Sequence, residues 1–86
     1  MSEIPRLRKR IDEIDDQLLS ILSERVKVCR AIGEAKKKQG KSIRDVTREN
    51  EIYKRLNVKA SEVGLDSGQV MAIYREIVNM CSAVQV

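Results

Sequence analysis

The sequence predicts an all-α fold of three helices, one long and two shorter, and two observations support that prediction. Apolar residues recur at spacings of three and four along most of the 86 residues, which is the period of one helix face. Strand signals are absent, because the chain has no alternating β-branched runs, no Asn-Gly or Asp-Gly pair and a single proline. We therefore expect three helices separated by glycine-containing breaks.

The first helix is expected from about residue 4 to Gly40, with Ser2 as a candidate N-cap and Gly40 as a candidate C-cap. About 35 residues at about 1.5 Å each form a rod of about 50 Å, whereas a globule of this length is only about 30 Å across. The chain cannot cover this helix alone, so we expect a partner chain. Its apolar row, interrupted by one charged residue, is Ile4, Leu7, Ile11, Ile14, Leu18, Ile21, Arg25, Val28, Ile32 and Ala35.

The second and third helices follow the break GKSIRDVT at residues 40–47, where Ser42 or Asp45 is placed to cap the second helix. Gly64 is expected to end that helix, and Asp66 with Gln69 three residues later is typical of a capping pair that opens the third. The second row is Val46, Glu49, Tyr53, Leu56, Ala60 and Val63, and the third is Val70, Ile73 or Tyr74, Ile77, Cys81 and Val84.

Composition limits the possible functions. The length fits a single domain over residues 1–86, and the formal charge of +4 suits an anionic partner without identifying one. The absence of His excludes imidazole catalysis and histidine metal sites. Cys29 and Cys81 lack CxxC spacing, so we expect buried free thiols rather than a metal site or disulfide. Without an apolar leader or a membrane-length segment, we expect a soluble cytoplasmic protein.

Two charged residues stand on apolar rows, Arg25 in the first helix and Glu49 in the second. A buried charge is costly unless it is paired or bound to a ligand, so the two residues either pair with each other or line a binding pocket. A third possibility is that the stem of Arg25 lies on the core while its head reaches water. Lys36 projects from the same face as Arg25, about 16 Å further along, and Gln85 faces the same way as Cys81.

Arg8 does not fit the same pocket. It lies seventeen residues before Arg25, which places it about 25 Å away along the helix and rotated by about 100°. If Arg8 belongs to the site, it must come from a partner subunit whose long helix runs antiparallel. The alternative is that the segment RLRKR is a solvated basic turn.

Several segments together resemble the all-helical (AroQ-class) chorismate mutases over essentially the whole chain. The matching segments are LRKRID, IDDQLL, LSER with Arg25, IGEAK with Lys36, IRDVTRE with Asp45, Arg48 and Glu49, and finally Gln85. The resemblance implies an intertwined homodimer of three-helix chains, with two equivalent sites that each borrow Arg8 from the other subunit. It also implies an isomerase that rearranges chorismate to prephenate without a cofactor, a metal or a covalent intermediate.

The family pattern assigns a role to each matching residue. Arg8 of the partner chain, Arg25 and Lys36 are expected to bind the two carboxylates of chorismate, and Lys36 and Gln85 to donate to its ether oxygen. Glu49 and the backbone N–H of Asp45 are expected to bind the ring hydroxyl, with Arg48 at the pocket rim. Cys81 stands where the family often has a hydroxyl residue, and a thiol is a weaker donor. Ser82 is a possible substitute.

Three alternative functions remain open at this stage. Isochorismate-pyruvate lyase resembles this family in fold and uses a similar cationic pocket. A basic helical dimer could bind nucleic acid through RLRKR and AKKKQGK, although two tyrosines and no Phe or Trp provide no stacking surface. A purely structural dimer is the third alternative. We expect neither nucleic-acid nor membrane binding.

Overall fold

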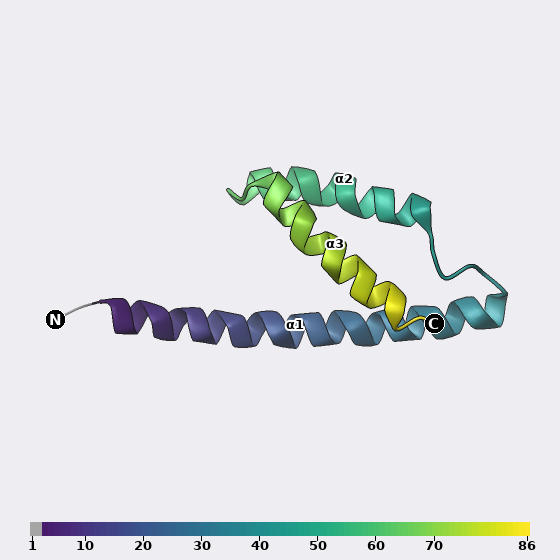
Figure 1. The fold of residues 1–86 in the computed structure, drawn as a ribbon, viewed down its shortest axis with the longest axis horizontal. Helices are drawn as coiled ribbons and strands as arrows, with labels where there is room; N and C mark the ends of the chain where they lie inside the picture. Colours follow the sequence, from purple (N-terminus) through teal and green to yellow (C-terminus); the bar gives the residue numbers. More distant parts are fainter. Residues whose placement is uncertain (1–2) are drawn as a thin grey trace.

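The computed structural model describes residues 3–86, and over this range the chain forms three α-helices and no strand (Figure 1). They are α1 (Ile4–Gln39), α2 (Val46–Glu62) and α3 (Ser67–Ala83). The prediction of an all-α fold with one long and two shorter helices is confirmed. Ser2, the candidate N-cap, lies outside the described residues, and Glu3 occupies the N-cap position without a side-chain cap bond.

The sequence signals for helix ends act as predicted. Gly40 ends α1 with φ of 66°, a left-handed conformation that glycine adopts without strain. The carboxylate of Asp45 accepts a hydrogen bond of 3.0 Å from the backbone N–H of Arg48, and so caps α2. The carboxylate of Asp66 accepts one of 2.9 Å from the N–H of Gln69 and caps α3. These caps fix where α2 and α3 begin.

Helix α3 lies diagonally between the other two helices and packs against both, whereas α1 and α2 do not pack against each other in the described chain (Figure 1). The chain end therefore returns to the C-terminal half of α1. The core within one chain is small, and its buried apolar residues are Cys29, Ile52, Leu56, Ala60, Val78 and Cys81. The end of α3 and the second half of α1 form one wall of a pocket.

The molecule is elongated. Its radius of gyration is 16.4 Å, against about 12 Å for a globule of this length, and its longest extent is 61 Å. The first half of α1 lies beyond the reach of α2 and α3, so its apolar row is exposed. None of the helices in the described range combines the length and hydrophobicity needed to cross a membrane.

Candidate active site

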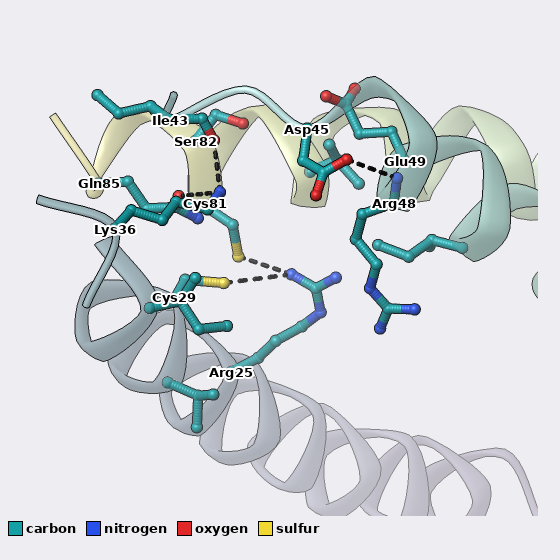
Figure 2. Close-up of a pocket in the computed structure, with 14 residues that line it drawn as sticks. Arg25, Cys29, Lys36, Ile43, Asp45, Arg48, Glu49, Cys81, Ser82 and Gln85 are labelled. Atoms are coloured by element: carbon teal, nitrogen blue, oxygen red, sulfur yellow. Dashed lines mark hydrogen bonds between the residues drawn. The ribbon is translucent and has the colours of Figure 1, made fainter. Parts of the chain in front are cut away.

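One pocket of about 360 Å³ is framed by the second half of α1, the connection to α2, the first turns of α2 and the end of the chain (Figure 2). Seven of the eight residues that the sequence analysis selected line it, and Arg8 does not. The full lining is Arg25, Val28, Cys29, Ile32, Lys36, Ile43, Asp45, Arg48, Glu49, Ile52, Val78, Cys81, Ser82 and Gln85.

Arg25 reaches into the pocket from α1, and within residues 3–86 its side chain donates hydrogen bonds to two sulfur atoms (Figure 2). Its Nη1 donates to the Sγ of Cys81 at 2.6 Å and to the Sγ of Cys29 at 3.8 Å. Thiol sulfur is a weak acceptor, and no carboxylate of the described residues forms an ion pair with Arg25. The alternative Arg25–Glu49 ion pair is therefore not formed. The guanidinium charge is left without a counter-ion, as an anion-binding group requires.

Lys36 is a second cation of the pocket lining that has no carboxylate partner among residues 3–86. Its Nζ donates to the side-chain Oε1 of Gln85 at 2.9 Å and to the backbone oxygen of Ile43 at 2.5 Å. An ammonium group carries three donors, so one remains for a ligand. Gln85 is only 9% exposed, and because Lys36 holds its amide oxygen, its NH₂ group is the part that remains available to donate. The contact with Ile43 could not be predicted from the pattern of side chains, because its acceptor is a backbone carbonyl.

The Glu49 carboxylate of the pocket is held in place by Arg44, a residue that the sequence analysis missed. Arg44 donates from Nε and from Nη2 to the two carboxylate oxygens of Glu49, each at 3.0 Å. This two-point contact fixes the carboxylate, which is only 15% exposed, whereas the Arg44 side chain is 64% exposed. The pair joins the loop before α2 to its first turn, so helix periodicity does not indicate it.

Arg48 lies at the rim rather than deep in the pocket. Its side chain is 60% exposed, and its Nη1 is 3.5 Å from a carboxylate oxygen of Glu51. Its role in ordering the pocket edge stays a prediction. Contacts between exposed ion pairs contribute little to stability, so Arg48 is free to change partner when an anion binds.

Two thiols form the apolar floor beside Arg25. Cys29 and Cys81 are both buried and free, as the sequence analysis predicted. The pKa of the Cys29 thiol is raised from 9.0 to about 11, chiefly by burial and to a smaller extent by the hydrogen bond to Cys81 and by the charge of Cys81. The nearby cations Arg25 and Lys36 oppose this shift without reversing it. Cys29 is thus a neutral thiol at physiological pH and carries no nucleophilic thiolate.

Arg8 lies in the exposed first half of α1 and does not contribute to this pocket in its own chain. Along an α-helix, seventeen residues span about 25 Å, which exceeds the reach of an arginine side chain. The expectation that Arg8 cannot share a pocket with Arg25 of the same chain agrees with this placement.

The arrangement favours binding and electrostatic stabilisation of a small anion. Two cations without counter-ions, a free amide NH₂ group and a fixed carboxylate converge on one space of about 360 Å³. Preorganised donors in a partly dry pocket stabilise charge that develops during a reaction, because they do not have to reorient. The pocket therefore combines groups that bind anions with one carboxylate that can accept hydrogen bonds.

Comparisons with known proteins identify a family and several related chains. The family model described as chorismate mutase type II matches residues 7–86. A bifunctional chorismate mutase/prephenate dehydratase of Aquifex aeolicus is 38% identical over 99% of the chain, which spans only 24% of that relative. A chorismate mutase of Methanocaldococcus jannaschii is 29% identical over 99% of the chain and 86% of its own length. A solved structure of a conserved hypothetical protein from Pyrococcus furiosus superposes with a TM-score of 0.79 and 31% identity, covering 100% of this chain and 99% of that one.

Proposed function

Because the chain belongs to the chorismate mutase type II family, we propose that it is an isomerase that converts chorismate to prephenate by an intramolecular Claisen rearrangement. The resemblance seen in the sequence motifs is confirmed by the family match. The single observation that carries the proposal is the convergence of Arg25, Lys36 and Gln85 in one pocket, with no carboxylate of the described residues neutralising either cation. This reaction is the branch step toward phenylalanine and tyrosine.

The two carboxylates of chorismate are bound by the cations. Arg25 offers a planar fork that can exchange its weak sulfur contacts for a two-point contact with a carboxylate. Lys36 offers its remaining ammonium donor as a point charge. Holding both carboxylates fixes the flexible substrate in its reactive, chair-like conformer, which lowers the entropy cost of the rearrangement.

Charge that develops on the ether oxygen as the C–O bond breaks is stabilised by Lys36 and Gln85. The 2.9 Å contact between Lys36 Nζ and Gln85 Oε1 keeps the two groups adjacent and turns the NH₂ of Gln85 away from Lys36. Both can then donate to one acceptor. Removing one such donor typically costs about 10²–10³ in rate. No nucleophile or proton carrier is needed, so a chain without His is adequate.

The ring hydroxyl is bound on the opposite side of the pocket by Glu49 and the backbone N–H of Asp45. Arg44 keeps the Glu49 carboxylate in place while leaving lone pairs on each oxygen for the substrate. Arg48 orders the rim. Cys81, buried beside Arg25, contacts the substrate carboxylate as a weak donor.

The active form is an intertwined homodimer in which each site receives Arg8 from the partner chain. The exposed apolar row in the first half of α1 supports the dimer, since a row of this length needs a covering surface. A two-fold dimer with antiparallel α1 helices would bring Arg8 of one chain toward the pocket of the other. Residues 1–86 act as one domain in the cytoplasm, where free thiols stay reduced, and bind neither nucleic acid nor membrane.

The test is to incubate the purified protein with chorismate and, separately, with isochorismate, and to identify the products by chromatography. Prephenate from chorismate is the expected result, whereas pyruvate and salicylate from isochorismate alone would identify the lyase instead. Lys36→Met is expected to lower the rate by about 10²–10³. Lys37→Met is the matched control, because Lys37 is exposed and its Nζ lies 3.8 Å from a Glu34 oxygen. Equal rates in both variants would argue against this pocket as the site.

A further inference from the structure

Gly33 is a buried glycine in the middle of α1, directly beneath the end of the chain. A Cβ atom placed on Gly33 would lie 2.8 Å from the Cα of Gln85 and 3.0 Å from its Cβ and Cγ. The nearest of these atoms belongs to the backbone, so a rotamer change cannot relieve the contact. The turn that carries Gln85 therefore approaches α1 as closely as it does because position 33 has no side chain.

The helix itself gives no reason for a glycine at this position. Helix α1 runs without a break from Ile4 to Gln39, and Gly33 is not among the glycines with positive φ. Glycine in a helix interior costs about 1 kcal/mol relative to alanine. The compensation must come from packing, and the packing partner of Gly33 is Gln85.

The close approach also determines where the Gln85 amide lies. Lys36 follows Gly33 by three residues, so both face the same side of α1. The Nζ of Lys36 holds the amide oxygen of Gln85 at 2.9 Å. The missing side chain of Gly33 lets the Gln85 backbone lie this close to α1. Together the two residues define the distance and the direction of the amide.

We propose that Gly33 is a positioning residue, whose missing side chain places the Gln85 amide against Lys36 and at the reacting centre. The proposal rests on the role proposed above for Gln85 as a donor to the ether oxygen. A misplacement of about 1 Å can cost about 10²-fold in rate. Gly33→Ala is therefore expected to lower kcat about 10- to 100-fold. KM should change little, because the carboxylates are bound by other groups.

The experiment is a double-mutant cycle with Gly33→Ala, Gln85→Ala and the double variant, measured as kcat and KM. We expect Gly33→Ala to lower kcat in the wild-type background and to have less than a twofold effect once Gln85 is alanine. Ala31→Gly is the control, since residue 31 is exposed and lies about 200° around α1 from Gly33. Ala31→Gly changes helix propensity near Gly33 without changing the packing against Gln85. Its kcat should stay at the wild-type value.

Each outcome is informative. If Gln85→Ala keeps the wild-type kcat, the proposed role of Gln85 fails, whatever Gly33→Ala does. If Gln85→Ala lowers kcat and Gly33→Ala does not, the positioning role is wrong. A further loss in the double variant would show that Gly33 acts independently of Gln85. Gly33→Ala should keep its helical circular dichroism, since alanine favours the helix. Loss of that signal would overturn the proposal, because the fall in kcat would then come from unfolding.

Discussion

The two halves of α1 belong to one uninterrupted helix but have different surroundings. Between residues 25 and 36 it carries buried Cys29 and Gly33 and the half-buried cations Arg25 and Lys36. Every residue from 3 to 21 is exposed, although this stretch has the same apolar spacing. The largest exposed fractions in its apolar row include 55% for Ile11, 60% for Leu18 and 63% for Ile21.

The two halves of α1 differ in what covers them within the described chain. The second half is covered by α3 of its own chain and supplies cations to the pocket. The first half has apolar residues to bury and a basic residue, Arg8, but residues 3–86 offer no surface to bury them against. Apolar rows of this length are normally covered, so the first half is the portion of α1 that a partner chain would use.

Mixing two inactive variants gives the largest expected effect and tests this division directly. Arg8→Ala and Arg25→Ala are each expected to lower kcat/KM by more than about 10²-fold. In a heterodimer of the two, one site carries both defects and the other carries neither. Random mixing of equal amounts should therefore restore about a quarter of wild-type activity, measured as prephenate formed after the chains exchange.

The matched control mixes Arg25→Ala with Lys36→Ala, two changes in the same half of α1. Each site of that heterodimer keeps one defect, so activity should stay at the level of the single variants. Recovery in this control, or no recovery with Arg8→Ala in verified heterodimers, would contradict shared sites. Comparing the two mixtures thus shows whether the first and second halves of α1 contribute to sites on different chains.

A charge placed in the first half of α1 should separate the dimer. Leu18→Glu puts a carboxylate on the exposed apolar row, where a partner would have to bury it without a counter-charge. We expect monomers at micromolar concentration by sedimentation, together with loss of activity. Ser23→Glu is the control, because position 23 is exposed and faces the opposite side of the helix. If Leu18→Glu stays dimeric and active, this surface is not the interface.

Much of this architecture could be predicted from the sequence. Spacings of three and four located all three helices, and the caps at Asp45 and Asp66 follow from local chemistry. Charged residues on apolar rows, read with the family motifs, selected seven residues that do meet in one pocket. The exposed first half of α1 also follows from length alone, since a rod of about 50 Å exceeds the globule that the chain could form.

The contacts that the sequence did not predict depend on how loops and helices are arranged in space. Arg44, in the loop before α2, holds Glu49 in the first turn of that helix, and no helix period specifies this contact. The contact of Gly33 with Gln85 depends on the angle at which α3 returns to α1. In the sequence, Gly33 only weakens a helix, and its packing partner is 52 residues away by numbering. Such contacts become visible only when the helices are placed together.

The smallest expected effect concerns the thiol that packs the second half of α1 against α3. The pKa of Cys29 is about 11 in the folded chain, against 9.0 for an ordinary thiol. Below pH 9 the folded and unfolded chains both keep the proton, so this thiol causes no pH dependence. Above pH 9 the unfolded chain loses its proton first, which favours unfolding.

The free energy of unfolding should therefore fall between pH 9 and pH 11 by more in the wild type than in Cys29→Ala. The extra fall is on the order of 1–2 kcal/mol and is read from urea midpoints at each pH. Lysines and tyrosines also titrate in this range, but they are shared by both proteins and cancel in the difference. Parallel curves would mean that burial of the neutral thiol does not stabilise this half of α1. The first half of α1 has no buried group of this kind in its own chain, so its stability should depend on the partner rather than on thiol ionisation.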